Sequence, residues 1–438
     1  MGEVVSHRPA VGAEGGPEGF RSVLREVAFR RVWFAQIAAQ LADKFLMFSL
    51  IILAYHLGRA STPVAITLLA YTVPAVVIAP LAGVFADRRD RKSIMVWTNV
   101  ARGALVALIP LLSYFPALRG DYLHLLAITF AFSAVGQLFS PAEAAAIPTL
   151  VPRRSLLTAN SMVLATMVIT LVVGGAAAPV VSRFDIYAPY WIATGLFCVA
   201  AVLIWAAAIP ANDGHPATDR HPFKQVAVEL KDGMDALRTS PVLLLSFYEL
   251  SLAVLVVFMM FTLAPAYVSR VIGVTAEDSY LILLPATLGA MVSAVILGQF
   301  GRRISRAWLL ISALVATGLT LIALASVPLA VRQVASLDVF VREFGAGFAL
   351  LLGLEFGALL IPSLTYLMEH TEDHLRGRVF ALLFMVVNGV TAVPVLLAAA
   401  LSDTFGIDHV IAALGLLLVV TGIAVAGLAR RVFAAAEP

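Results

Sequence analysis

The sequence predicts an all-α membrane protein whose twelve transmembrane helices form two six-helix bundles. Composition is the first reason, because the 438 residues are 61% hydrophobic and 13% charged, with a mean hydropathy of +0.95. Soluble domains are about half apolar and about a quarter charged. The apolar runs are the second reason, because they reach the roughly 20 residues that cross a bilayer as a helix. The period-2 alternation of a membrane barrel is absent, which leaves helices as the expected spanning elements.

Twelve apolar segments follow one another, and one long polar stretch divides them into two sets of six. The expected spans are 31–57, 65–86, 93–115, 122–144, 157–182, 187–210, 241–269, 277–299, 307–329, 343–368, 378–401 and 407–429. The expected domains are an N-terminal tail (1–30), an N-terminal bundle (31–210), a linker (211–240), a C-terminal bundle (241–430) and a C-terminal tail (431–438). In the linker, Val226, Leu230 and Met234 recur every four residues, which predicts an amphipathic helix on the membrane surface.

Basic residues are distributed unequally between the two sides of the predicted membrane. With the N-terminus inside, the inner loops and tails hold 22 Lys and Arg residues and the outer loops hold 6. Such an excess marks the cytoplasmic side, so both termini are expected in the cytoplasm. Arg outnumbers Lys 26 to 4, and Ala and Gly are abundant, which is typical of a GC-rich bacterial genome. The expected location is therefore the bacterial inner membrane.

A dense cluster of charge lies between the second and third spans. Residues 83–92 read Gly-Val-Phe-Ala-Asp-Arg-Arg-Asp-Arg-Lys. The equivalent turn of the second half, residues 298–306, repeats the glycine, the phenylalanine and two arginines at a constant offset of 215. The match predicts that the two bundles are copies of one unit. Because both copies share one topology, they would be related by an axis along the membrane normal.

This turn carries a resemblance to a known family. Gly83, Asp87, Arg88, Arg91 and Lys92 match the signature Gly-x3-Asp-[Arg/Lys]-x-Gly-[Arg/Lys]-[Arg/Lys] of the major facilitator superfamily, with Asp90 where that family has glycine. The chain also resembles the enterobactin-exporter and macrolide-efflux branch at Ser140-Pro141-Ala142, Pro148, Leu150-Val151-Pro152, Asn160, Arg376-Gly377-Arg378-Val379-Phe380 and, more loosely, Gln36 to Lys44. The resemblance covers nearly the whole chain and implies a two-domain transporter with rocker-switch alternating access. It does not specify the substrate.

The resemblance also implies that this turn acts as a cytoplasmic gate. Gly83 would let the second span pack closely against the eleventh, and Asp87 would cap a helix N-terminus or pair with a base across the two halves. Such contacts exist only while the cytoplasmic side is closed, so they set the balance between the outward-open and inward-open states. The remaining residues of the expected gate motif are Arg88, Asp90, Arg91 and Lys92. The further candidates for the inner gate are Glu143, Arg376 and Arg378.

Three carboxylates, Asp43, Glu249 and Glu355, lie deep in predicted spans. Placing each in a membrane costs about 2.5–3.5 kcal/mol, which makes each a functional candidate. They fall in spans one, seven and ten, which line the central cavity with span four in the family that the chain resembles. An acid in a low-dielectric cavity can bind and release a proton, so we expect proton coupling through at least one of them. The alternative is that some of them neutralise Lys44 and Arg102.

The first span carries a polar stripe. Gln36, Gln40 and Asp43 are spaced i, i+4 and i+7, so they share one helix face. A stripe of this kind indicates the wall of a wet cavity and makes all three candidates for the cavity. A buried structural pair is the alternative interpretation for Asp43.

Two buried bases also need partners. Lys44, one residue after Asp43, is rotated about 100° from it around the helix, and it is expected to pair with an acid on a neighbouring helix. Arg102, in the third span, is expected to hold the N-terminal bundle together through Asp43 or Asn99. Many proton-coupled members of the family carry an arginine in the fourth span, where the deepest polar residue of this chain is Gln137. The usual drug–proton antiport mechanism is therefore not implied directly.

The sequence favours a secondary active exporter of a small amphipathic or lipophilic compound, drug-like or siderophore-like, driven by protons. Its mostly aliphatic and aromatic spans suit a lipophilic or partly cationic cargo better than a sugar. No ATP-binding loop is present, and all eight histidines fall in tails, loops or span ends, so we expect neither an enzyme nor a cofactor nor a metal site. The alternatives are a lysophospholipid or lipid transporter, which the first span and Ser140-Pro141-Ala142 also resemble, and a non-transporting receptor.

The expected partners follow from this reading. They are a small-molecule substrate, protons and the lipid bilayer, with the protein itself a monomer. The net charge of +3 is too small to indicate nucleic acid. The single cysteine, Cys198, leaves no disulfide framework.

Overall fold

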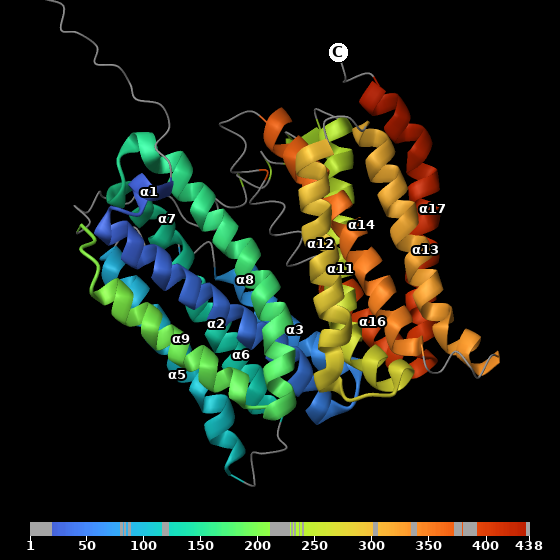
Figure 1. Cartoon of the computed structure of the whole chain (residues 1–438), viewed down its shortest axis with the longest axis horizontal. Helices are drawn as coiled ribbons and strands as arrows, with labels where there is room; N and C mark the ends of the chain where they lie inside the picture. The colour runs from blue at the N-terminus through green and yellow to red at the C-terminus, as the bar shows by residue number, and fades with distance from the viewer. Residues whose placement is uncertain are drawn as a thin grey trace, which may run out of the picture.

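The computed structural model of the chain confirms the expected all-α membrane class (Figure 1). It describes residues 20–78, 82, 85, 89–115, 122–210, 228, 231, 234, 235, 237, 238, 241–300, 305–333, 340–371, 379 and 392–434. Among these residues there is no strand, and ten helices are long and apolar enough to cross a bilayer. Two shorter apolar helices, Ser61–Val77 and Ala392–Phe405, lie where spans two and eleven are expected. The described helices therefore fit the expected twelve.

The first half of the chain supplies one group of helices, in which the first span is central. Its helices are α1 (Phe20–Val23), α2 (Val27–Gly58), α3 (Ser61–Val77), α5 (Arg91–Ser113), α6 (Leu123–Gly136), α7 (Phe139–Leu150), η1 (Arg153–Ser155), α8 (Leu156–Phe184) and α9 (Ala188–Trp205). Helix α2 packs against α3, α8 and α9, while α5 packs against α6, α7 and α9. The long first span is thereby surrounded by its own half along much of its length.

The fourth span differs from the single segment 122–144 that the sequence predicts. It is divided into α6 and α7, and the helix continues to Leu150. Pro141 has no N–H to donate to the carbonyl of Gln137, and the N–H of Leu138 bonds to Val135 in a tighter turn. The division of span four therefore follows from a proline one turn beyond it.

The second half of the chain supplies the other group. Its helices are α11 (Pro241–Tyr267), η2 (Val268–Ile272), η3 (Ala276–Ser279), α12 (Tyr280–Phe300), α13 (Arg306–Gln333), α14 (Val341–His370), α16 (Ala392–Phe405) and α17 (Ile407–Ala434). Glycines bring two pairs of these helices into backbone contact. A Cβ on Gly353 of α14 would lie 1.8 Å from the carbonyl oxygen of Ala286 in α12, and one on Gly318 of α13 would lie 2.6 Å from that of Gly415 in α17.

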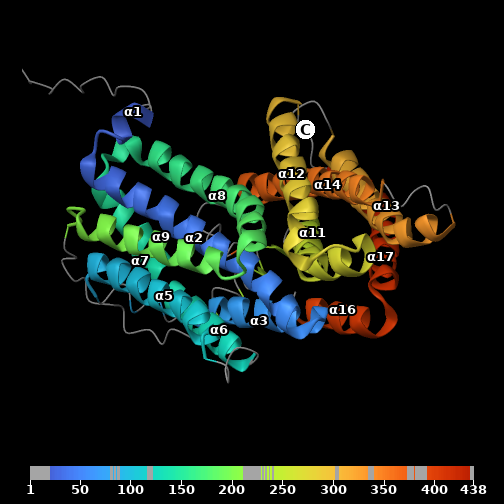
Figure 2. The same ribbon diagram turned by 60° about the horizontal axis from the view of Figure 1, so that its bottom comes forward.

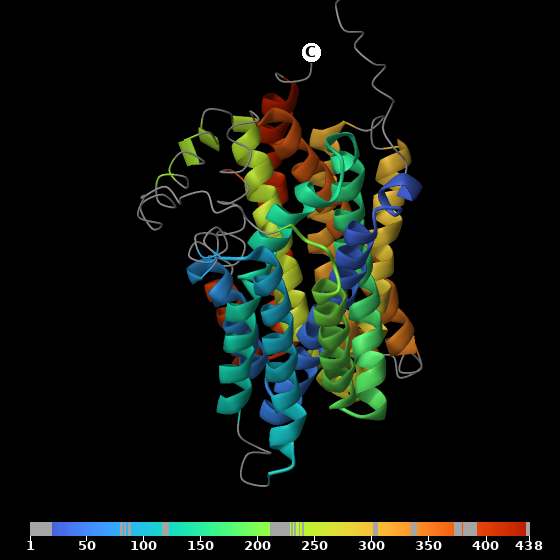
Figure 3. The same cartoon turned by 90° about the vertical axis from the view of Figure 1, so that its left-hand side faces the viewer.

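The two groups lie side by side, with α1 and the end of α17 at the same end of the molecule (Figures 1 and 3). Large apolar side chains such as Trp97, Trp205 and Trp308 are exposed on the outside, where lipid would surround them. Of the expected surface helix in the linker, Val226 and Leu230 lie outside the described residues, as do the two tails at 1–19 and 435–438.

Candidate functional site

The two halves are joined by hydrogen bonds at the end of the molecule opposite α1, which we call the closed end. There α16 approaches the start of α3 (Figure 2). The carboxylate of Asp403 in α16 accepts hydrogen bonds from the backbone N–H groups of Ser61 and Thr62 and from the Thr62 hydroxyl, each at 2.8 Å. The N–H groups of a first helical turn have no partner within their own helix. Asp403 therefore caps α3 from the other half of the chain, where the helix dipole also favours its charge.

An arginine completes this contact, which we call the α3–α16 latch (Asp403, Ser61, Thr62 and Arg270). Arg270 of η2 donates to Asp403 at 3.3 Å and to the carbonyl oxygen of Arg59 at 3.1 Å. A second link lies at the same end between α8 and η3, where Arg183 pairs with Asp278 at 3.1 Å. The polar contacts thus connect the two halves at two separate places.

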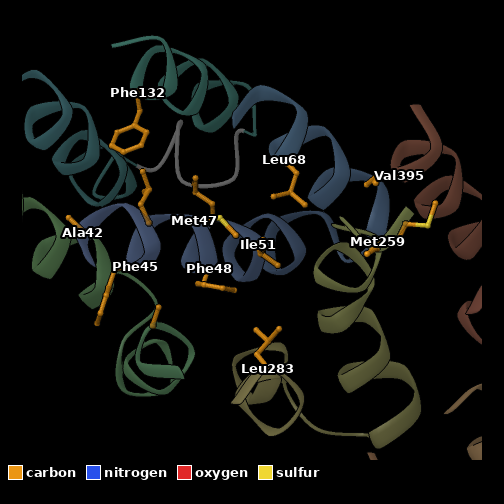
Figure 4. Close-up of a cluster of buried hydrophobic side chains, with 14 of the residues drawn as sticks. Ala42, Phe45, Met47, Phe48, Ile51, Leu68, Phe132, Met259, Leu283 and Val395 are labelled. Carbon is orange, nitrogen blue, oxygen red and sulfur yellow. The ribbon is translucent and has the colours of Figure 1, made fainter. Parts of the chain in front are cut away.

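An apolar cluster, which we call the plug, lies between helices of the two halves (Figure 4). Its members come from both halves and are buried: Phe48, Ile51, Leu68, Met259, Leu283 and Val395. The ring of Phe48 in α2 also meets Phe261 in α11 edge to face, with centroids 5.4 Å apart. Apolar packing and charged hydrogen bonds therefore join the halves together at the closed end.

The deep charges of the first half converge on Asp43. One carboxylate oxygen accepts a hydrogen bond from the Arg102 guanidinium. The other accepts from the Tyr71 hydroxyl at 2.8 Å and from the Lys44 ammonium at 3.1 Å. Two cations and a hydroxyl therefore stabilise a single carboxylate. Asp43 is thus the partner of Arg102 that the sequence predicts, whereas among the described residues Lys44 bonds to its own neighbour and not to an acid on another helix.

Aromatic rings hold the Arg102 side chain in place. Its guanidinium carbon lies 4.3 Å from the ring centroid of Phe132 and 4.6 Å from that of Phe197. Both distances fall in the range of cation–π attraction. Gly136, the last residue of α6, leaves room for the group, because a Cβ there would lie 3.4 Å from the Arg102 Nε. The arginine is therefore fixed by three helices besides its own: α2, α6 and α9.

The deep acids of the second half have a different environment. Glu355 of α14 accepts a hydrogen bond from the Thr320 hydroxyl of α13 at 2.7 Å, and its second oxygen has no partner among the described residues. Glu249 of α11 is 1% exposed, and neither of its oxygens is bonded within the described chain. Ser246, one turn before it, is also buried, and its hydroxyl has no hydrogen-bond partner within the described chain. No described basic side chain pairs with either glutamate.

The remaining candidates lie apart from these acids. Gln36 is buried, while Gln40 and Asp43 keep partial exposure, so the polar stripe is only partly accessible. Glu143 is buried in α7, with one oxygen unbonded among the described residues. Gly83, Asp87, Arg88, Arg376 and Arg378 lie outside the described residues.

The described part of the charged turn is tied to the first half. Asp90 caps α5 by accepting hydrogen bonds from the Ser93 hydroxyl at 2.7 Å and the Ser93 N–H at 2.8 Å. These bonds, with that of the hydroxyl foremost, lower the pKa of Asp90 below its ordinary value. Arg91 donates to the carbonyl oxygen of Ala145 in α7 at 3.1 Å, and Lys92 follows it in the first turn of α5. The acid that departs from the family signature is thus the N-cap of span three.

Sequence reasoning missed the residues of the closed end. Arg183 and Arg270 are two of the six basic residues counted in the outer loops, and nothing in the sequence distinguishes Asp403 or Asp278 from other charged residues. The positions of these four residues in the sequence do not indicate that they pair, because each lies near the end of a predicted span, where charged residues are common. Tyr71 was also missed, although a tyrosine hydroxyl inside an apolar span needs a partner.

The model of the Major Facilitator Superfamily matches residues 32–393. The chain belongs to this superfamily. It is 23% identical to the uncharacterized MFS-type transporter YfiS of Bacillus subtilis over 84% of this chain and 85% of the relative. It is 24% identical to the multidrug efflux pump Tap of Mycolicibacterium fortuitum over 86% and 89%.

The fold of the chain is similar to that of solved transporters. It matches the crystal structure of the nucleoside transporter NupG (D323A mutant) with a TM-score of 0.69 and 10% identity, over 91% of this chain and 99% of that one. The protein is therefore a multi-pass membrane transporter of a small molecule, not an enzyme.

Proposed function

We propose that the protein is a proton-coupled exporter of a small amphipathic or lipophilic compound, working by alternating access in a bacterial inner membrane with both termini in the cytoplasm. The observation that carries the proposal is the contrast between the halves. Asp43 is bonded to two cations, whereas Glu249 and Glu355 are buried without one among the described residues. Similarity to a multidrug efflux pump supports the direction of transport.

The contrast assigns different tasks to the acids. Asp43 stays ionised, because protonation would leave Arg102 and Lys44 without their counter-ion. A buried carboxylate without a cation is costly in its charged form, so a proton relieves much of the penalty. Glu249 and Glu355 can then load a proton in one conformation and release it where water reaches them. A proton that binds one state better than the other shifts the balance between the two.

The closed end provides one of the two gates that alternating access needs. With the orientation indicated by the basic residues, it faces the outside, because α3 begins there and both described chain ends lie opposite. The α3–α16 latch, the Arg183–Asp278 pair and the plug then form the outer gate. The turn at residues 83–92 with Asp87 forms the inner gate at the cytoplasmic side.

Proton flux in everted membrane vesicles tests the assignment. With a cationic probe (ethidium) and an anionic one (dansylglycine) tested in parallel, the unmodified protein should release protons from the vesicle interior in response to at least one of the two. Glu355→Gln or Glu249→Gln should abolish this signal by removing the proton site, while the purified variants remain folded. Glu343→Gln is the matched control, because Glu343 lies exposed in the first turn of the same helix as Glu355. Unchanged proton movement in both variants would overturn the site assignment.

A further inference from the structure

We propose that Lys44 binds an anionic group of the transported compound, such as a carboxylate, so that the cargo is an amphipathic anion or zwitterion. The inference deepens the proposed transport function and rests on it. Three observations carry it: the charge balance around Asp43, the exposure of α2, and the packing of the Lys44 side chain.

The charge balance leaves Lys44 in surplus. Asp43 carries one negative charge, which the Arg102 guanidinium already pairs. The Lys44 ammonium has three hydrogens to donate, and one bonds to Asp43. Within the described residues, no second acid is bonded to Lys44. A cation without a counter-ion is costly inside a membrane, so a bound anion would lower the free energy of this site.

The exposure of α2 shows where this charge points. Phe34, Ile37, Leu41 and Lys44 are spaced i, i+3, i+7 and i+10, and all four retain exposure. From residue 45 to residue 55 every side chain of α2 is buried. One turn beyond Lys44 on the same face lies Phe48, which meets Phe261 of the other half. Lys44 is thus the last exposed position on this face of α2 before the plug, where the two halves meet.

The packing of Lys44 suits an ammonium that is offered to a ligand. Its stem lies against Gly174 of α8, where an added Cβ would be 2.4 Å from the Lys44 Cβ. The stem is therefore held by packing while the head keeps some exposure, as long basic side chains do in membranes. Gln40, one turn earlier on the same side and partly exposed, adds an amide donor. Apolar Leu41, Ile37 and Phe34 keep exposure on the same face, where the hydrocarbon part of an amphiphile would lie.

Three fluorescent probes with one apolar group separate charge from hydrophobicity: dansylglycine (anionic), dansylamide (neutral) and dansylcadaverine (cationic). Binding is measured by fluorescence on the purified full chain in a non-ionic detergent. Dansylglycine should bind about tenfold tighter than dansylamide, because it alone forms a charge-assisted bond with Lys44. Lys44→Gln should remove this difference and leave dansylamide unchanged, while Lys44→Arg should retain it. Lys231→Gln, in the linker, is the control for loss of one positive charge.

A labelling experiment tests the exposure of position 44 independently. In a Cys198→Ala background, Lys44→Cys should react with an anionic, membrane-impermeant methanethiosulfonate added to the cytoplasmic face. Ser49→Cys should not react, because Ser49 is nearly isosteric with cysteine and lies buried on α2. Absence of labelling at position 44 would overturn the proposal, as would equal affinity of the unmodified protein for dansylglycine and dansylamide.

Neither measurement requires a proton gradient. Failure here would leave the proton-flux test of Glu249 and Glu355 unaffected. If Glu249→Gln and Glu355→Gln kept the proton signal while dansylglycine still bound, only the proposal of proton coupling would be overturned.

Discussion

Asp43 is the single residue on which the charges of the first half depend. Asp43→Asn leaves Arg102 and Lys44 without a counter-ion, whereas Arg102→Met leaves a neutral Asp43–Lys44 pair and much of the side-chain volume. Breaking a buried ion pair costs about 3–5 kcal/mol of unfolding free energy. We expect Asp43→Asn to be the more destabilising change in detergent unfolding experiments.

A double-mutant cycle would isolate the interaction itself. The double variant Asp43→Asn/Arg102→Met should lose less unfolding free energy than the two single variants lose in sum, because the first substitution already breaks the ion pair that the second would break. The expected difference is about 1–3 kcal/mol. Additive effects would show that the two side chains contribute independently and that their contact is not the source of the destabilisation.

Asp90 links a single carboxylate to acid stability. Its pKa is lowered in the folded state, so it contributes stability above the ordinary value of 3.8, and that stability is lost as the pH falls through the lower folded value. Asp90→Ala should lower the free energy of unfolding by about 1 kcal/mol at neutral pH, because α5 loses its N-cap. Asp90→Asn should keep most of the cap and flatten this part of the acid profile. Thermal unfolding between pH 6 and pH 3 measures both; identical acid profiles for Asp90→Asn and the unmodified protein would contradict the assignment.

At the level of helices, the contact between α12 and α14 depends on glycine. Gly353→Ala would place a methyl group 1.8 Å from the Ala286 carbonyl oxygen, so the two backbones must separate. Overpacking of this kind costs about 1–3 kcal/mol. Gly347→Ala, on the same helix with no atom within 4 Å of its added Cβ, should be neutral or stabilise slightly, since alanine favours helices over glycine. Equal thermal unfolding midpoints for the two variants would contradict a tight α12–α14 contact.

The helices themselves were largely predictable because lipid imposes a length on each apolar run. The sequence prediction for α2, 31–57, lies within four residues of Val27–Gly58 at each end. The fourth span was predicted, but its break between α6 and α7 was not, because hydropathy does not register the missing N–H of Pro141. The pairing of Arg102 with Asp43 could be proposed, since two opposite charges inside apolar spans of one bundle need partners. The role of Asp403 could not, because helix capping between residues 341 positions apart leaves no local pattern.

For the molecule as a whole, the two ends should oppose each other in the conformational equilibrium. Asp403 caps α3 only while the closed end stays closed, and the sequence assigns Asp87 a similar task at the other end. Loss of Asp87 should favour the inward-open state, as expected from the gate motif. Loss of Asp403 should favour the outward-open state. The hydrogen bonds that the first turn of α3 and Arg270 donate to Asp403 exist only in the outward-closed form, so their removal destabilises that form alone.

Spin labels across the closed end measure this shift. Tyr114 and Phe405 are exposed there and belong to different halves, so a pair of labels at these positions in a Cys198→Ala background reports their separation. Asp403→Ala removes several hydrogen bonds to one carboxylate and should raise the ratio of open to closed forms about tenfold, within the usual range of coupling energies. Arg270→Gln should shift it less, because the caps on Ser61 and Thr62 remain. Asp408→Ala is the control, since this nearby acid pairs with His409 of its own half at 3.2 Å. A distance distribution for Asp403→Ala that coincides with that of Asp408→Ala would show that the α3–α16 latch does not hold the outer gate.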